Sequence, residues 1–155
     1  MMATNHMLVG AAVAVGIKQP WLVVPIAMAT HFILDLFPHF GILESDTPER
    51  NNHPLFRTIL TLDIILAVLG LIFLPIILQH IVQWWVVFIG MLAAWLPDVV
   101  WIVHFIHDKK GHIRKAPTRL TLFHQKIQWF EKPVGIITEI VWMGGMGTFL
   151  ILAVR

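Results

Sequence analysis

The long apolar runs of this chain limit what it can fold into. As helices rising about 1.5 Å per residue, residues 56–79 and 134–154 are each long enough to cross the ~30 Å hydrocarbon core of a membrane. Residues 84–105 form a third such run, with an expected kink at Pro97. Of the 155 residues, 57% are hydrophobic and only 13% are charged, whereas soluble domains average roughly a quarter charged residues. Composition and run length therefore both indicate a membrane protein.

Two shorter apolar segments come first. Residues 7–17 would make about 18 Å of helix, too short to span alone, and the sequence KQP separates them from residues 21–37. After a polar loop over residues 41–54, the apolar residues of 120–130 recur at helical spacing and predict an amphipathic helix at the membrane interface. The predicted fold is all-α: residues 1–155 form one polytopic helical membrane bundle. It has a short N-terminal helix plus hairpin, about four to five membrane elements and one interfacial amphipathic helix.

Basic residues are distributed unevenly between the two sides of this arrangement. One side receives the basic stretch HDKKGHIRKAPTR and most of the other lysines and arginines, and the opposite side receives only Lys18 and Arg155. The positive-inside rule then places the first side and the N-terminus in the cytoplasm. The basic stretch has no pattern for base stacking, so we expect membrane lipid and no nucleic acid as its partner. A bundle this small is also compatible with a homo-oligomer.

Ionisable residues interrupt the apolar runs near one end of the predicted bundle. In THFILDLFPHFG, His31, Asp35 and His39 follow each other at spacings of four. Ionisable groups are expensive in lipid and usually mark a functional site that faces the bundle interior. Since residues i and i+4 share a helix face, His31 and Asp35 can reach one ion or hold one proton network. Asp98, the deepest acidic group of residues 84–105, is the third candidate.

Several of these stretches resemble a known family. The runs NHMLVGAAVAVG, THFILDLFPHFG and AAWLPDVV are similar to the small integral-membrane proteins called membrane-bound metal-dependent hydrolases. The HxxxD motif has a weaker resemblance to part of the zinc-dependent phospholipase C fold. The resemblance implies a bacterial inner-membrane protein that binds a divalent metal, zinc foremost and otherwise manganese or iron, and acts on phosphoester or lipid substrates. The ligand candidates that it implies are His6, His31, Asp35 and Asp98, with His39 and His124 as further ones.

The departures from the family leave the catalytic residues unassigned. The family commonly carries a proline–aspartate–x–aspartate–histidine run, and this chain has only the pair Pro97–Asp98. With no cysteine in the chain, any metal ligand must be His, Asp, Glu or a backbone oxygen. The first hypothesis is therefore a metal-dependent hydrolase at the cytoplasmic face. The alternative is a non-enzymatic proton- or ion-handling or structural bundle that uses the same His/Asp cluster as a buried polar network.

For several other residues the sequence leaves more than one role open. Asp63 and Glu139 suit a role in orienting a ligand, a role as general base, or a structural one. His104 and His107 lie beside the basic stretch and are expected at the interface or in water. Gly10, on the same helix face as His6, favours close approach to a neighbouring helix, and close packing is also the expected reason for the glycines of GGMG at 144–147.

Overall fold

The computed structural model describes residues 1–42, 48–99 and 119–155, and all of their regular structure is helical. The all-α prediction is confirmed for these residues. A single isolated bridge pairs His39 with Glu131. The α-helices are α1 (Ala3–Ile17), α2 (Pro20–Asp35), α3 (Pro48–Asn52), α4 (Pro54–Leu78), α5 (Trp84–Trp95), α7 (Arg119–Ile127) and α8 (Ile136–Ala153), and the 3-10 helices are η1 (Leu96–Asp98) and η2 (Pro133–Gly135).

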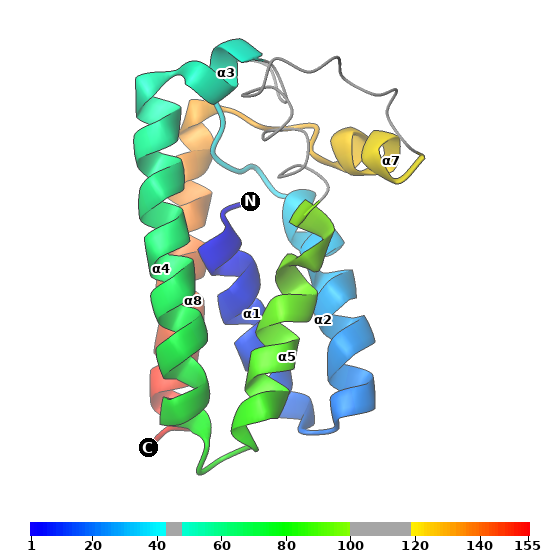
Figure 1. Ribbon diagram of the computed structural model, residues 1–155, viewed down its shortest axis with the longest axis vertical. Helices are drawn as coiled ribbons and strands as arrows, with labels where there is room; N and C mark the ends of the chain where they lie inside the picture. The colour runs from blue at the N-terminus through cyan, green and yellow to red at the C-terminus, as the bar shows by residue number, and fades with distance from the viewer. Residues whose placement is uncertain (43–47, 100–118) are drawn as a thin grey trace.

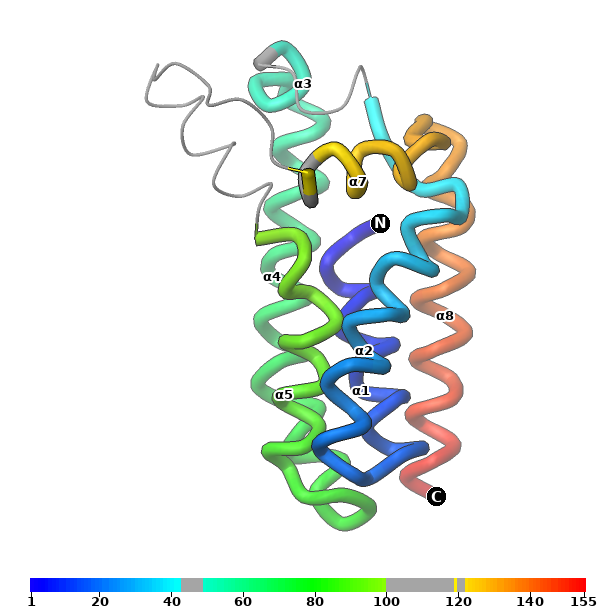
Figure 2. The backbone as a smooth tube through the Cα atoms, turned by 90° about the vertical axis from the view of Figure 1, so that its right-hand side faces the viewer, coloured from blue at the N-terminus to red at the C-terminus, as the bar shows by residue number. Residues whose placement is uncertain are grey.

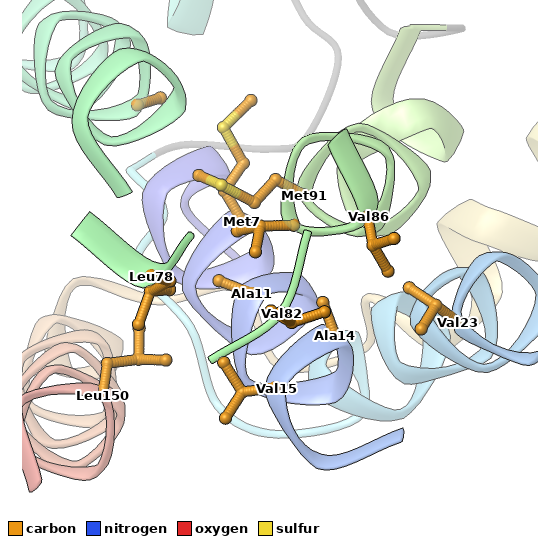
Figure 3. Packing of buried hydrophobic residues seen from close by; sticks show 12 residues of the cluster. Met7, Ala11, Ala14, Val15, Val23, Leu78, Val82, Val86, Met91 and Leu150 are labelled. Carbon is orange, nitrogen blue, oxygen red and sulfur yellow. The ribbon is translucent and has the colours of Figure 1, made fainter. Parts of the chain in front are cut away.

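The helix α1, which corresponds to the shortest apolar run predicted from the sequence, is the central helix of the bundle. It packs against α2, α4, α5 and α8, which surround it (Figure 1). In Figure 3, Met7, Ala11 and Ala14 of α1 lie in the middle of the core, with side chains from the other helices around them. Because α1 is enclosed by protein, it does not need the length of a membrane span.

Small residues let α1 and α5 cross closely. A Cβ atom built on Gly10 would lie 2.4 Å from the carbonyl oxygen of Gly90, and one on Gly90 would lie 2.8 Å from the carbonyl oxygen of Gly10. The expected close approach of the His6–Gly10 face is thereby confirmed. The same expectation is wrong for GGMG within the part of the chain that the structure describes, since a Cβ on Gly144, Gly145 or Gly147 meets nothing within 4 Å.

Two helical stretches are long and apolar enough to cross a membrane by length and composition: Pro54–Leu78 and Pro133–Ala153. Only 17% and 11% of their most apolar windows are buried, so most of their apolar side chains point away from the bundle. The run at 84–105 forms a helix as far as Trp95 and then tightens into η1 at Pro97, as the proline predicts. Its residues from 100 onwards lie outside the described ranges.

One end of the bundle is closed by α7, by the turn after α2 and by residues 128–135, which connect α7 to α8. The short helix α7 lies across the end at which α1 begins (Figures 1 and 2). Backbone hydrogen bonds join His39 to Phe130 and Lys132, and the nitrogen of Gly41 to the oxygen of Lys132. Gly135 approaches His39 so closely that a Cβ would lie 2.1 Å from its carbonyl carbon. These contacts hold α7 and the turn after α2 together above the start of α1.

Candidate metal site

Four side chains from three elements converge beneath α7. His31 and Asp35 come from α2, Asp98 from η1 and His124 from α7, and one ligand atom of each lies within 4.8 Å of all the others. His31, Asp35 and His124 are buried, and Asp98 is partly exposed. The structure therefore brings together four of the six ligand candidates named from the sequence, including His124, which lies 93 residues after His31 in the chain.

The distances within this group suit a metal ion. The Nε2 atom of His124 lies 2.8 Å from Oδ2 of Asp35. The Nε2 atom of His31 lies 3.2 Å from the same oxygen and 3.1 Å from Nε2 of His124. Oδ1 of Asp98 is 3.7 Å from His31 Nε2 and 3.8 Å from His124 Nε2. Tetrahedral ligands at the usual zinc distances are about 3.3 Å apart, which lies between these values.

Local structure fixes the tautomer of His31. Its Nδ1 lies 2.8 Å from the carbonyl oxygen of Ala94 on α5. A carbonyl only accepts hydrogen bonds, so Nδ1 carries the proton of the neutral ring and Nε2 presents a lone pair to the group. Metal-binding histidines are oriented in this way, with the second ring nitrogen donating to a carbonyl or carboxylate. The i, i+4 spacing of His31 and Asp35 on α2 puts both groups on the same face.

His6 lies next to the four residues without joining their group. Its ring stacks on that of His31 with centroids 4.0 Å apart. Its Nε2 is 3.2 Å from Oδ1 of Asp35 and 4.0 Å from Oδ2 of Asp98. Neither ring nitrogen makes a hydrogen bond to the described residues, although the side chain is completely buried. A buried ring nitrogen without a well-aligned hydrogen-bond partner is costly.

His39, the other candidate, is placed apart from the four. Its Nδ1–H donates to the carbonyl oxygen of Phe37 at 2.9 Å, and it takes part in the bridge to Glu131. Burial lowers the pKa of His39 from 6.5 to about 4, so the ring is neutral near pH 7. His104 and His107 fall outside the described residues.

His124 is the residue that sequence reasoning ranked too low. Burial opposes its protonation, but the hydrogen bond to Asp35 and the charge of that carboxylate outweigh burial and raise the pKa of His124. The amide nitrogen of Gln128, one turn further along, lies 3.3 Å from Oδ2 of Asp35. The signal was present in the sequence, because residues 120, 124 and 127 share one helix face. A histidine on the apolar face of an amphipathic helix is expected to contact the bundle.

Asp63 and Glu139 have a clear structural role. The carboxylate of Asp63 accepts hydrogen bonds from the backbone nitrogens of Ala3 and Thr4 at 2.8 and 2.9 Å. Glu139 accepts from the backbone nitrogen of Met2 and, at 2.6 Å, from the side-chain amide of Asn5. The two acids therefore satisfy the free amide groups at the start of α1, where the helix dipole is also positive.

The ammonium group of Met1 also contacts this group of residues. The Met1 ammonium donates a hydrogen bond of 2.7 Å to Oδ1 of Asp35. Together with His124 and Gln128, it contacts both oxygens of the Asp35 carboxylate. This arrangement can hold a divalent cation through the lone pairs of His31 and His124 and the two carboxylates. The same groups can alternatively share protons among themselves.

Comparison with known proteins adds no relative to this picture. No family model, no curated protein and no solved structure matches the chain.

Proposed function

We propose that this protein is a membrane-embedded metal-dependent hydrolase that acts on a phosphoester or lipid-linked substrate. The observation that carries the proposal is the group of four ligand atoms from His31, Asp35, Asp98 and His124, all within 4.8 Å of one another. Two imidazoles and two carboxylates form a ligand set that suits zinc, and also manganese or iron. The resemblance to the membrane-bound metal-dependent hydrolases, seen in the sequence, favours the same activity.

A membrane location is supported by the surface of the bundle. The helix α4 exposes large apolar side chains around most of its circumference, among them Leu62, Leu66 and Leu69. A soluble monomer rarely leaves contiguous apolar surface of this extent in water. On α7 and just after it, Leu122, Phe123 and Trp129 are more than half exposed, as is typical of residues that anchor a helix at a membrane interface. We infer a multi-pass protein of the bacterial inner membrane with the site at its cytoplasmic face.

The four residues of the site would each supply one ligand to the metal ion. His31, held by Ala94, would offer Nε2 to the ion, with His124, Asp35 and Asp98 as the other ligands. A divalent ion at this position supplies Lewis-acid polarisation of a phosphoryl or carbonyl oxygen and lowers the pKa of water. Asp98 is the ligand nearest to the outside, since its side chain is 18% exposed while those of His31 and Asp35 are fully buried. A substrate would therefore reach the site past Asp98.

The alternative function is a non-enzymatic bundle in which the same residues form a buried polar network. The contacts of Asp35 favour it, because the Met1 ammonium and His124 already pair this carboxylate. Such a network would hold α1, α2 and α7 together or pass protons. It would not require a stoichiometric metal ion.

Metal analysis of the purified protein separates these two functions. Wild-type protein would be purified in detergent, reloaded with zinc, manganese or iron in turn, and analysed for bound metal. The ligand variants are Asp98→Asn, chosen because Asp98 is partly exposed, and His124→Gln. His53→Gln, at an exposed histidine that is not a member of the group, is the matched control.

The hydrolase proposal expects about one ion per chain in the wild type and the control, and a loss of about tenfold or more in affinity in both ligand variants. Circular dichroism would establish that all samples remain folded. Wild-type protein that binds no metal after reloading would overturn the proposal in favour of the polar network.

A further inference from the structure

A cavity of about 320 Å³ leads from the candidate metal site along α4 and α5. Asp98 and His124 line it at one end, so the cavity is continuous with the group of four ligand residues. Its volume lies at the lower end of the range for small-molecule sites. Because the metal site and the cavity share two residues, whatever reacts at the site has this cavity as its nearest space.

Most of the residues that line the cavity are apolar, although Arg50, Asp63 and Glu131 line it as well. On α4 the apolar wall includes a stripe formed by Leu60, Ile64, Val68 and Leu71, and Leu92 and Trp95 line the cavity from α5. The α4 residues recur at three- and four-residue spacing, so they form one continuous stripe along the helix. From Leu60 to Leu71 this stripe is about 16 Å long at the helical rise per residue. The cavity is thus elongated, with a polar end and an apolar tail.

The apolar part of the cavity opens to the outside of the bundle. Ile64 and Val68 line it and are nevertheless 51% and 50% exposed. They lie in the middle of α4, the longest helix of the described chain. In a membrane this opening would face the hydrocarbon layer. A molecule that is already dissolved in the bilayer can therefore enter sideways without crossing water.

We infer that the cavity binds the hydrocarbon chain of a membrane amphiphile whose phosphate head lies at the His/Asp group. This inference rests on the proposed function and narrows it, because it selects a substrate with a long apolar chain over a water-soluble phosphoester. The head would lie beside Asp98 and His124, and the chain would run along the α4 stripe towards Leu71. Recognition of the substrate then depends mainly on the buried length of its chain.

Photolabelling with alkyl phosphates tests the inference on the full chain in phosphatidylcholine nanodiscs. The probe is dodecyl phosphate with a diazirine at the end of the chain, and the labelled peptides are identified by mass spectrometry. Unlabelled dodecyl phosphate, butyl phosphate and inorganic phosphate serve as competitors. The last two carry the same phosphate chemistry with little or no chain, so they distinguish a lipid-chain site from a site for free phosphate.

Two pairs of tryptophan variants test the position of the chain. Val68→Trp and Leu60→Trp place a large ring in the cavity. Leu69→Trp and Leu62→Trp make the same change on α4 at exposed positions that do not line it. Val68 lies at the half-exposed mouth of the cavity, so its substitution is compatible with folding.

We expect labelling of α4 that dodecyl phosphate suppresses and that butyl phosphate suppresses at least about tenfold less effectively, because the short chain buries little apolar area. The labelling should fall about tenfold in Val68→Trp and Leu60→Trp and stay unchanged in the two controls. Equal competition by butyl or inorganic phosphate, or equal labelling in cavity and control variants, would overturn the inference.

Metal content measured on the same samples distinguishes a failure of the hydrolase proposal from a failure of the proposed hydrocarbon-chain site. If metal binds and chain-selective labelling is absent, the chain site is wrong and the hydrolase proposal stands. Chain-selective labelling in protein that binds no metal would support the cavity assignment and overturn the hydrolase proposal.

Discussion

The helices α1 and α8 are similar in length and in apolar character, yet the structure places them in opposite surroundings. Nine of the 15 residues of α1 are buried, including Thr4, Asn5 and His6. In α8, 18 residues long, only Glu139 and Leu150 are buried. Apolar content therefore does not distinguish a helix surrounded by protein from one that faces outwards. Small residues at a crossing point and polar groups with partners at the helix start are what mark the enclosed helix.

The largest expected effect comes from substituting equivalent glycines in the two helices. Gly10→Leu forces a side chain into the backbone of Gly90, and we expect a loss of about 4 kcal/mol or more in the free energy of unfolding. Gly145→Leu points into open space within the described structure and should change stability by less than about 0.5 kcal/mol. Unfolding of both variants in detergent, followed by circular dichroism, measures the difference. Equal losses would mean that α8 is packed as tightly as α1.

The start of α1 gives the next largest effect. Asp63→Ala leaves the buried backbone nitrogens of Ala3 and Thr4 without their acceptor, which should cost about 3 kcal/mol of unfolding free energy. Thr61→Ala on the same helix is the control, because its exposed hydroxyl bonds only within α4, to the carbonyl of Arg57. The measurement is again chemical unfolding in detergent. If the two variants lose the same stability, the cap does not hold α1 in place.

A third effect, no larger than the second, tests the contact between the turn after α2 and the start of α8. The pKa of His39 is about 4 in the folded chain, whereas its ordinary value, taken for the unfolded chain, is 6.5. Between these values the unfolded chain binds a proton that the folded chain does not, so stability falls as the pH drops from 6.5 to 4 and is regained as it rises. The loss at pH 4 should be about 3 kcal/mol, because each pKa unit corresponds to about 1.4 kcal/mol. His39→Gln should remove most of this acid loss.

Unfolding free energies at several pH values, for wild type, His39→Gln and the exposed control His53→Gln, check this prediction. Asp35 and His124 also act electrostatically on His39, and both are retained in all three proteins. An unchanged acid loss in His39→Gln would assign the pH dependence to those groups instead.

Much of the fold was predictable because apolar periodicity and prolines report directly on helices. Periodicity placed the apolar helices close to most of their observed limits, and the α-helix gives way to η1 at Pro97, where a kink was predicted. The prediction of a loop over residues 41–54 was wrong for Pro48–Asn52, which form α3. The i, i+4 spacing predicted that His31 and Asp35 share a face, and they do. The number of membrane elements and the side on which the site lies remain predictions, since two helices meet the length and composition of a span.

The candidate site was only partly predictable, because its members meet through tertiary contacts. His124 lies on a helix whose position depends on the backbone pairing of residues 38–41 with residues 130–132, and no local pattern encodes that pairing. From the sequence, Asp63 and Glu139 were possible members of the site. In the structure, their carboxylates accept hydrogen bonds from backbone amide groups at the start of α1. The glycines of GGMG resembled a packing motif, but a sequence does not show which helix face is covered.

The sequence by itself determined that the chain is helical and apolar, that cysteine plays no part, and that histidine and aspartate interrupt its apolar runs. These properties are local, because helix formation and hydropathy depend on residues within a few turns of each other. Only the tertiary structure decided that α1 is the central helix, that His124 completes the group with His31, Asp35 and Asp98, and that an apolar cavity joins it. Those features depend on which helix faces meet, and that choice is made by close packing and by the pairing of buried polar groups over the whole chain.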